Sequence, residues 1–306
     1  MPSKAVLFDF DGTLADTASD LSRAVNRLRS ARGLAELPLE ALRPHASAGA
    51  RGLIGAGLGI APEHSDYKPL REAFLEHYKN EICIDTRLFP GMLDLLSTLE
   101  ARRLRWGIVT NKSAHLTQLL VRALGLEART ACVVCGDTTP HLKPHPASLL
   151  HAARELSLAP ADCIYLGDDL RDIQAARAAG MRSVAVGWGY GGDIASWQAD
   201  AVIGHPLDLV ARNGENWSTE IEQRVGQRVT LLGWLVTFRH VATKNYRNMM
   251  FATMEDQRGL FEVVLFPPAY ERCGRWVFEA RMLRVTGRVE LDGHVNCEHM
   301  EPVKVL

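Results

Sequence analysis

The sequence carries almost no excess charge of either sign. Its 35 Lys and Arg residues nearly balance 36 Asp and Glu residues, which gives a formal net charge of -1. This balance argues against a dedicated duplex-DNA-binding protein, which needs a basic excess, and confines any nucleic-acid role to part of the chain. The sequence also has no run approaching the ~18 consecutive apolar residues of a membrane span, so we predict no membrane contact.

Cysteine is scarce, and the six cysteines are scattered apart from Cys132 and Cys135. The chain opens on a strand-like run and not on a charged segment followed by an apolar stretch and a cleavage site, which indicates a reduced, cytoplasmic protein. Cys132 and Cys135 form a C-x-x-C pattern in a run that looks like a buried strand, where residues three apart point to opposite faces. We therefore interpret them as core residues.

The composition is that of a folded protein. At 306 residues, with 47% hydrophobic and 23% charged residues, the chain is long enough for two domains with their own cores. Residues 4–8 form an apolar run that ends at Asp9-Phe-Asp-Gly-Thr13, which predicts a buried strand followed by a polar turn. A helical pattern then covers 17–32 and continues to about residue 78, which interrupts the alternation of strands.

From residue 90 onward, predicted helices alternate with short apolar strands. The strands are expected at 105–109, 131–134, 163–166 and 183–186, and the helices at 91–103, 114–124, 146–156 and 170–179. This alternation is typical of an α/β fold with a Rossmann-like, doubly wound parallel sheet. In such sheets, ligands bind beyond the carboxyl ends of the strands.

The character of the sequence changes after residue 211. The polar, turn-rich stretch 212–219 predicts a linker, which we place at 212–224. Beyond it, five β-runs without intervening helices are expected at 228–238, 246–255, 260–266, 281–290 and 294–300. We therefore predict that residues 225–306 form a small, closed, five-stranded β-barrel.

Two carboxylates stand at the end of the first predicted strand. Asp9 and Asp11 lie two apart, and where a strand ends the chain can aim both side chains into one crevice. Cleavage of a phosphomonoester needs a nucleophile, a proton donor for the leaving oxygen, and cations. One carboxylate can attack phosphorus while the other protonates the leaving group, so this pair favours phosphoryl chemistry.

Four short segments follow predicted strands in order: Asp9-Phe-Asp-Gly-Thr13, Ile108-Val-Thr-Asn111, Lys143-Pro144 and Gly167-Asp-Asp-Leu-Arg-Asp172. Taken singly, each is compatible with a turn, a solvated loop or a helix N-cap. Together they resemble the motifs of the haloacid dehalogenase superfamily, over about residues 4–210. The resemblance implies an Mg²⁺-dependent phosphatase whose core comprises 1–15 and 86–211, with an inserted helical cap at 16–85.

The resemblance also implies a role for each motif residue. Asp9 would attack phosphorus to form an aspartyl phosphate, and Asp11 would protonate the leaving oxygen and then take a proton from water. Thr110 would hydrogen-bond a phosphoryl oxygen, with Asn111 nearby as a substrate contact. Lys143 would offset the negative charge of the transferring phosphoryl group.

Mg²⁺ prefers oxygen ligands and keeps several waters. The resemblance implies that Asp9, the backbone carbonyl of Asp11 and Asp168 bind the ion. Asp172 is the residue that usually assists in metal binding. Asp169 is a carboxylate at the same strand end and competes with Asp172 for that role. The sequence does not rank the two.

The cap would exclude water and hold the non-reacting part of the substrate. In its small-residue loop 45–52, Arg51 is a candidate ligand for a carboxylate or hydroxyls; the alternative is an exposed charge at a helix start. Segments 86–91, 106–112 and 167–172 are most similar to bacterial phosphoglycolate phosphatases, and nearly as similar to N-acetylmuramic acid 6-phosphate phosphatases. A sugar-phosphate mutase fits less well, because its cap would have to protect the phosphorylated intermediate from water.

The C-terminal β-runs resemble the oligonucleotide-binding (OB) barrel of bacterial replicative DNA polymerase alpha subunits, over about 80 residues. Such barrels bind single strands through a positive groove and through aromatic platforms, on which bases stack for about 1 to 3 kcal/mol each. Residues 225–306 hold 11 Lys and Arg against 9 Asp and Glu, a slight basic bias. A different class of function is therefore single-stranded nucleic-acid binding; the alternative is that these aromatics belong to the barrel core. The candidate surface lies at the first hairpin of the barrel and comprises Phe238, Arg239, His240, Lys244, Tyr246 and Arg247.

Overall fold

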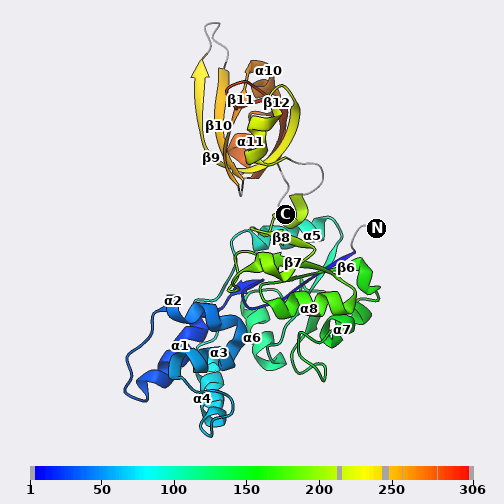
Figure 1. Ribbon diagram of the computed structural model, residues 1–306. Helices are drawn as coiled ribbons and strands as arrows, with labels where there is room; N and C mark the ends of the chain where they lie inside the picture. The colour runs from blue at the N-terminus through cyan, green and yellow to red at the C-terminus, as the bar shows by residue number, and fades with distance from the viewer. Residues whose placement is uncertain (1–3, 212–215, 243–247, 257, 281, 303–306) are drawn as a thin grey trace. The chain divides into compact units, whose positions relative to one another are not determined.

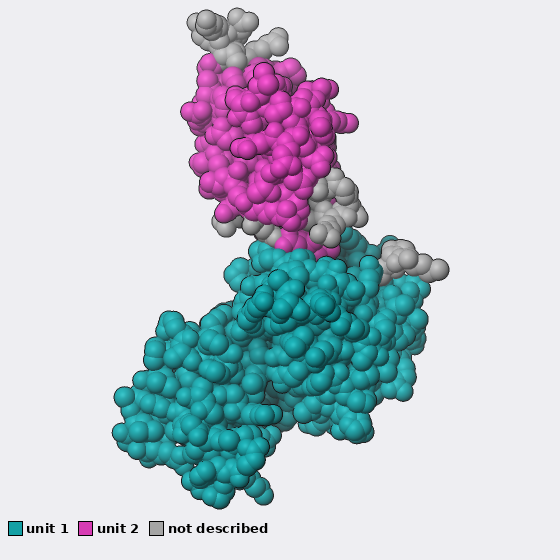
Figure 2. All heavy atoms as spheres, viewed as in Figure 1, with its two compact units in different colours: residues 1–206 teal, residues 207–306 magenta. Residues whose placement is uncertain are grey.

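The structure is a computed structural model that describes residues 4–211, 216–242, 248–256, 258–280 and 282–302 (Figure 1). The chain divides into two compact units, residues 1–206 and 207–306, which are coloured separately in Figure 2. No helix of the described residues combines the length and the apolar character needed to cross a membrane.

The first unit is built on a six-stranded, all-parallel sheet with the order β5-β4-β1-β6-β7-β8. Its strands are β1 (Ala5–Phe8), β4 (Arg105–Val109), β5 (Val133–Val134), β6 (Cys163–Gly167), β7 (Arg182–Val186) and β8 (Ala201–Ile203). The central strands are almost continuously buried, as expected where helices cover both faces of a parallel sheet. The predicted Rossmann-like sheet is therefore confirmed.

Helices connect these strands, and one core cluster lies between helices and sheet. The helices are α5 (Met92–Ala101), α6 (Ala114–Ala123), α7 (Ala147–Glu155) and α8 (Leu170–Ala179), with short 3-10 turns η2 (Pro160–Asp162) and η3 (Ile194–Trp197). Leu149 of α7 and Ala176 of α8 share a buried cluster with Leu7 of β1. Cys132 and Cys135 are buried free thiols, and burial raises the pKa of Cys132 to about 12, so this thiol stays protonated.

The edge strand β8 was not expected from the sequence. Its three residues, Ala201-Val-Ile203, form an apolar run that is shorter than the four to eight residues by which a buried strand is recognised. The strand expected at 131–134 also shortens to the two residues of β5.

The helical block follows β1 in the sequence and precedes β4, and in space it lies to one side of the sheet (blue to cyan in Figure 1). It contains α1 (Ala18–Ser30), α2 (Leu39–Leu42), η1 (Arg43–Ala48), α3 (Gly49–Leu58) and α4 (Tyr67–Asn80). Two short antiparallel strands, β2 (Ala15–Asp16) and β3 (Arg87–Leu88), pair where the chain enters and leaves it. We call residues 16–85 the cap.

The second unit is a closed barrel with the order β10-β11-β13-β12-β9. Its strands are β9 (Arg228–Ala242), β10 (Asn248–Asp256), β11 (Gly259–Leu265), β12 (Met282–Val289) and β13 (Val295–Pro302), preceded by α9 (Asp208–Ala211) and η4 (Ser218–Arg224). The predicted five-stranded barrel is confirmed. Within the predicted linker, η4 places Ile221 in the barrel core, and Ser218 donates hydrogen bonds to Asp256.

The prediction that no helix interrupts the β-runs was wrong. Helices α10 (Pro267–Cys273) and α11 (Trp276–Glu279) lie between β11 and β12. Pro267 and Pro268 open α10, where the missing N–H costs nothing and the fixed φ suits a helix. This proline pair was the available signal.

Candidate active site

The candidate catalytic side chains converge at the carboxyl edge of the parallel sheet. Asp9 follows β1 and Asp168 follows the adjacent strand β6, while Thr110 follows β4 on the other side of β1. The chain runs outward from β1 through β4 and from β6 through β7, so the crevice between β1 and β6 is the topological switch point, where ligands bind. A cavity of about 570 Å³ opens there and is lined by both core and cap residues.

Lys143 contacts several groups of the site at once. Its side chain is 3% exposed, and its Nζ lies 2.8 Å from Asp9 Oδ1 and 2.7 Å from Asp172 Oδ1. Nζ also donates to the hydroxyl of Tyr165 on β6 at 2.7 Å and to the carbonyl of Val109 at 3.3 Å. Burial alone would lower the pKa of Lys143, but the charges of Asp172 and Asp9 raise it, so the ammonium stays charged.

Three carboxylates cluster at this site, and two of them, Asp9 and Asp172, contact the ammonium. Ligand oxygens of Asp9, Asp168 and Asp172 all lie within 4.8 Å of one another. Burial, followed by repulsion from Asp9 and Asp172, raises the pKa of Asp168 to about 8. Burial also raises the pKa of Asp172, as does the charge of Asp9, although Lys143 opposes the shift. These raised pKa values mean that the cluster resists holding a full negative charge on every acid unless a further cation offsets that charge.

Asp168 is fixed by contacts from three directions. Thr13 donates to its Oδ1 at 3.0 Å, while Ser47 of the cap and the backbone N–H of Tyr190 each donate to Oδ2 at 2.9 Å. Gly12, with φ +81, lets the chain turn beside this carboxylate, because a Cβ there would lie 2.1 Å from Asp168 Oδ2.

Asp172 and Asp169 have distinct positions. They form a reciprocal capping box at the start of α8, in which Asp169 N donates to Asp172 Oδ2 at 3.1 Å. Asp172 belongs to the buried acidic cluster. The carboxylate of Asp169 instead pairs with Arg171, whose Nη2 also donates to the carbonyl of Ser47 in the cap.

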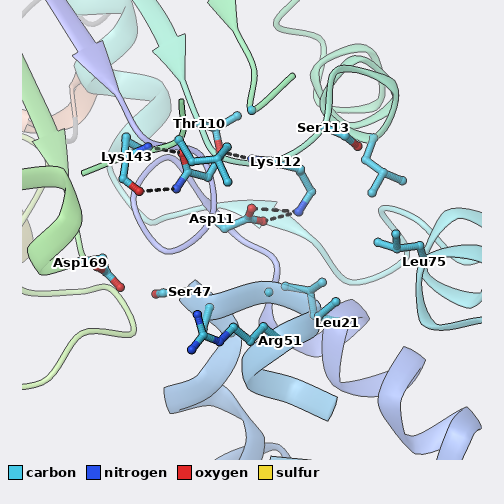
Figure 3. A pocket seen from close by; sticks show the side chains of 18 of the residues that line it. Asp11, Leu21, Ser47, Arg51, Leu75, Thr110, Lys112, Ser113, Lys143 and Asp169 are labelled. Carbon is cyan, nitrogen blue, oxygen red and sulfur yellow. Dashed lines mark hydrogen bonds and ion pairs between the residues drawn. The ribbon is translucent and has the colours of Figure 1, made fainter. Parts of the chain in front are cut away.

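Asp11 faces the cavity and is paired with a lysine that the sequence analysis did not single out. Lys112 Nζ donates to Asp11 Oδ1 at 2.8 Å and Oδ2 at 2.9 Å, and Thr17 donates to Oδ1 at 2.6 Å. Figure 3 shows Asp11 and Lys112 on the core side of the cavity, with Ser47 and Arg51 opposite on the cap. Lys112 directly follows the Thr110-Asn111 motif, and that adjacency was the available signal.

Thr110 and Asn111 line the cavity with different hydrogen bonds. Thr110 Oγ1 accepts from Lys112 N at 3.3 Å, which leaves its own O–H able to donate. Asn111 uses both ends of its amide on the backbone of Lys143, at 2.9 and 3.1 Å. Asn111 therefore holds Lys143 in place. Arg51 is an exposed side chain of α3 that lines the cavity from the cap.

Tyr190, which the sequence analysis did not single out, joins the core to the beginning of the cap. Its hydroxyl accepts hydrogen bonds from Thr17 N at 2.6 Å and Ala18 N at 3.0 Å, and donates to Asp16 Oδ1 at 2.8 Å. Arg43 pairs with Asp16 and lies over the Tyr190 ring. The first turn of α1 is thus satisfied by a core residue.

The acidic cluster fits a divalent cation. Asp9, Asp168 and Asp172 supply only carboxylate oxygens, the donor type that Mg²⁺ selects, and Lys143 alone does not neutralise them. Asp168 accepts hydrogen bonds from both the core and the cap, and these bonds hold it in position for such an ion.

The barrel residues predicted to bind nucleic acid are only partly described. The ring of Phe238 lies 5.1 Å from that of Phe278, between centroids, and Arg239 stands over Phe251 at 4.5 Å. His240 is exposed on β9, whereas Lys244, Tyr246 and Arg247 lie outside the described residues. Phe238 is 39% exposed and Phe278 58% exposed, so this aromatic pair is not core.

The chain matches two family models. Residues 6–186 match the haloacid dehalogenase-like hydrolase family, and residues 229–303 match the OB-fold nucleic acid binding domain family. The resemblance to the haloacid dehalogenase superfamily and the OB-type assignment of the barrel are thereby confirmed.

Relatives resemble the first unit over nearly their whole length. An N-acetylmuramic acid 6-phosphate phosphatase of Pseudomonas putida is 39% identical over 212 residues, which cover 68% of this chain and 95% of the relative. A phosphoglycolate phosphatase of Xanthomonas campestris pv. campestris is 45% identical over 213 residues, 67% of this chain and 94% of the relative. The crystal structure of a predicted phosphoglycolate phosphatase from Haemophilus somnus 129pt superimposes with a TM-score of 0.62 at 25% identity, covering 68% of this chain and 96% of that one. The chain belongs to the haloacid dehalogenase-like hydrolase family and is a phosphoric monoester hydrolase.

Proposed function

We propose that the first unit hydrolyses a small phosphomonoester of the 2-phosphoglycolate type through an aspartyl phosphate, with Mg²⁺ as cofactor. The observation that carries this proposal is the position of Lys143 Nζ, within 2.8 Å of both Asp9 and Asp172 at the switch point of the sheet. A buried ammonium at that place can offset the negative charge of the nucleophile and of a phosphoryl group together.

The residues divide the reaction into two steps. Asp9 attacks phosphorus, and the phosphorus–oxygen ester bond breaks while Asp11 gives a proton to the leaving oxygen. Asp11 then takes a proton from a water, whose oxygen attacks the phosphorus and releases Asp9. Thr110 donates its hydroxyl to a phosphoryl oxygen, and Lys143 holds the charge. Mg²⁺, held by Asp9, Asp168 and the carbonyl of Asp11 with Asp172 as helper, would supply further positive charge.

A substrate panel tests this proposal. The full chain with Mg²⁺ should release phosphate from 2-phosphoglycolate with a kcat/KM at least about tenfold above that for 4-nitrophenyl phosphate, because binding energy from the rest of the substrate raises the rate. EDTA should stop the reaction, and excess Mg²⁺ should restore it. No phosphate release from any ester would contradict the proposal; activity that survives EDTA would contradict the cofactor.

N-acetylmuramic acid 6-phosphate is the second substrate candidate, and the cap side of the cavity favours it. Arg51 and Arg71 line the cavity, and neither forms an ion pair with a carboxylate of the described residues. Two available cations suit a larger substrate whose carboxylate lies many bonds from the ester. The volume of about 570 Å³ falls within the ~300–1,000 Å³ typical of small-molecule sites. The same panel should include this sugar phosphate.

For the second unit, we propose binding of single-stranded nucleic acid. The support is an aromatic cluster on the barrel surface, in which Phe238, His240, Tyr270 and Phe278 lie 5.1 to 5.9 Å apart between neighbouring ring centroids. The exposed rings of Phe238 and Phe278 can stack on bases of any sequence. The family match of residues 229–303 agrees with this use.

Replacing Phe238 and Phe278 together by Ala should weaken binding of the full chain to labelled oligo(dT) by about tenfold or more, because two stacking platforms are lost. Fluorescence anisotropy at two salt concentrations measures the affinity, which should fall as salt rises. The matched control is Leu291→Ala, which removes an apolar side chain that is 92% exposed on the same unit. Unmodified protein that fails to bind oligo(dT) at low salt would exclude this proposal.

A further inference from the structure

We propose that Lys112 and Tyr78 form a subsite that binds a carboxylate of the leaving group. The carbon of this carboxylate is attached directly to the carbon that carries the phosphate ester. This inference rests on the proposed phosphatase function and deepens it, because it selects 2-phosphoryloxy acids over esters without a neighbouring carboxylate. The subsite joins one core residue with one cap residue, and both line the cavity that holds Asp9 and Asp11.

Lys112 brings a positive charge that is largely shielded from solvent to the lining of the cavity. Its side chain is 8% exposed, and its backbone is held at both ends, by Thr110 Oγ1 at 3.3 Å and by Gly136 N, which donates to the Lys112 carbonyl at 2.8 Å. An ammonium has three N–H donors. The oxygens of Asp11 accept two of them, and no acceptor among the described residues takes the third.

Tyr78 of α4 brings a second unused donor. The residue is 1% exposed, and its hydroxyl is buried without a hydrogen-bond partner in the described part of the chain. A buried polar group without a partner costs free energy, which a ligand that supplies the partner recovers. The Lys112 ammonium lies 4.8 Å from the centroid of the Tyr78 ring, so the two side chains are in contact on the cavity lining.

A carboxylate satisfies both donors at once. Its two oxygens offer about four acceptor sites and a full negative charge, so one oxygen can accept from the ammonium and the other from the phenol. Leu21, Phe74 and Leu116 line the same cavity, and apolar surroundings strengthen a charge pair relative to water. A neutral group of the same size gains much less here.

The position of Lys112 sets which carboxylate fits. Asp11 is the proposed proton donor to the ester oxygen, and Lys112 Nζ lies within 2.9 Å of both oxygens of Asp11. A group that reaches the ammonium must therefore stand close to the ester oxygen. Arg71 is seven residues before Tyr78 on α4, about 10 Å along the helix, and serves only a more distant group.

The test compares 2-phosphoglycolate with ethyl phosphate, which has the same two-carbon ester but a methyl group in place of the carboxylate. The measured quantity is the ratio of the two kcat/KM values for the full chain with Mg²⁺. Lys112→Met should lower this ratio by about 30-fold or more, because a charge-assisted hydrogen bond is lost for one substrate alone. Effects on Asp11 change both rates and cancel in the ratio. Lys68→Met, which removes an exposed cap lysine outside the cavity, should leave the ratio within about twofold.

Tyr78→Phe separates binding from structure. It removes only the hydroxyl and should lower the ratio by about fivefold, while the melting temperature stays or rises because an unsatisfied buried group is gone. A ratio unchanged in both variants, with ethyl phosphate still hydrolysed, would overturn the subsite and leave the phosphatase proposal standing. A wild-type chain that hydrolyses neither ester would instead overturn both.

Discussion

Replacing Asp9 by Asn should reduce phosphatase turnover by about 10⁴-fold or more, with the fold intact. The substitution is nearly isosteric, but an amide cannot attack phosphorus, and loss of the nucleophile removes the covalent step. Hydrolysis of 4-nitrophenyl phosphate measures the effect. The variant loses the ion pair between Asp9 and Lys143, but Lys143 keeps Asp172 as a charge partner and repulsion among the three clustered carboxylates falls, so stability should change little.

The matched control for this variant is Asp162→Asn. Asp162 pairs with Lys4 at 2.9 Å on the surface, away from the cavity, so the same chemical change there should leave turnover within about twofold. Near-normal turnover by Asp9→Asn, in protein with an unchanged circular dichroism spectrum, would contradict the assignment of Asp9 as the nucleophile.

Lys143→Met should both inactivate and destabilise the protein. The substitution leaves Asp9 and Asp172 facing one another without the buried ammonium that lies between them. Removing one partner of a buried charge pair typically costs about 3 to 5 kcal/mol, because the remaining charge stays desolvated. Urea denaturation monitored by tryptophan fluorescence measures the loss, and turnover should fall by about 10³-fold or more.

A second substitution distinguishes the two effects of Lys143→Met. Adding Asp172→Asn removes one of the stranded charges and should recover part of the free energy of unfolding, but it restores no positive charge to the phosphoryl site. Turnover should therefore remain low. If the double variant were no more stable than Lys143→Met, the buried ion pair would not be the cause of the destabilisation.

The parts of the site that the sequence could predict are those that follow strands. Asp9, Thr110 and Asp168 come directly after apolar runs, and parallel strands bring their carboxyl ends to one edge. The roles of these residues remain predictions, but their meeting place follows from the alternation of strands and helices. Lys143 lies in a loop, and only its resemblance to a known motif predicted that it belongs to the site.

Contacts between cap and core could not be predicted in this way. The hydrogen bonds of Ser47 to Asp168 and of Tyr190 to the start of α1 join residues more than 100 positions apart. They depend on how a helical block packs against a loop, for which no period or spacing exists in the sequence. For the same reason Asp169 and Asp172 could not be ranked: their difference comes from which one turns inward at the start of α8.

In the barrel, the strands could be predicted from the sequence, but an aromatic contact on its surface could not. Its five strands could be predicted from alternation and turns, whereas the ring of Phe238 on β9 meets that of Phe278 on α11 only in the folded barrel. The sequence named Phe238 for its place in a hairpin. Its aromatic partner lies forty residues away and carried no local signal.

Each unit buries a core of its own: one described cluster draws only on residues 5–181, and another only on residues 221–300. Heat or denaturant should therefore unfold the chain in two cooperative transitions, one for each unit. A single unfolding midpoint is not a defined quantity for such a chain. Phosphate or a divalent cation should move just the event that belongs to the phosphatase unit. A ligand screen that follows a fluorophore in the barrel would score a true ligand of the phosphatase as inactive.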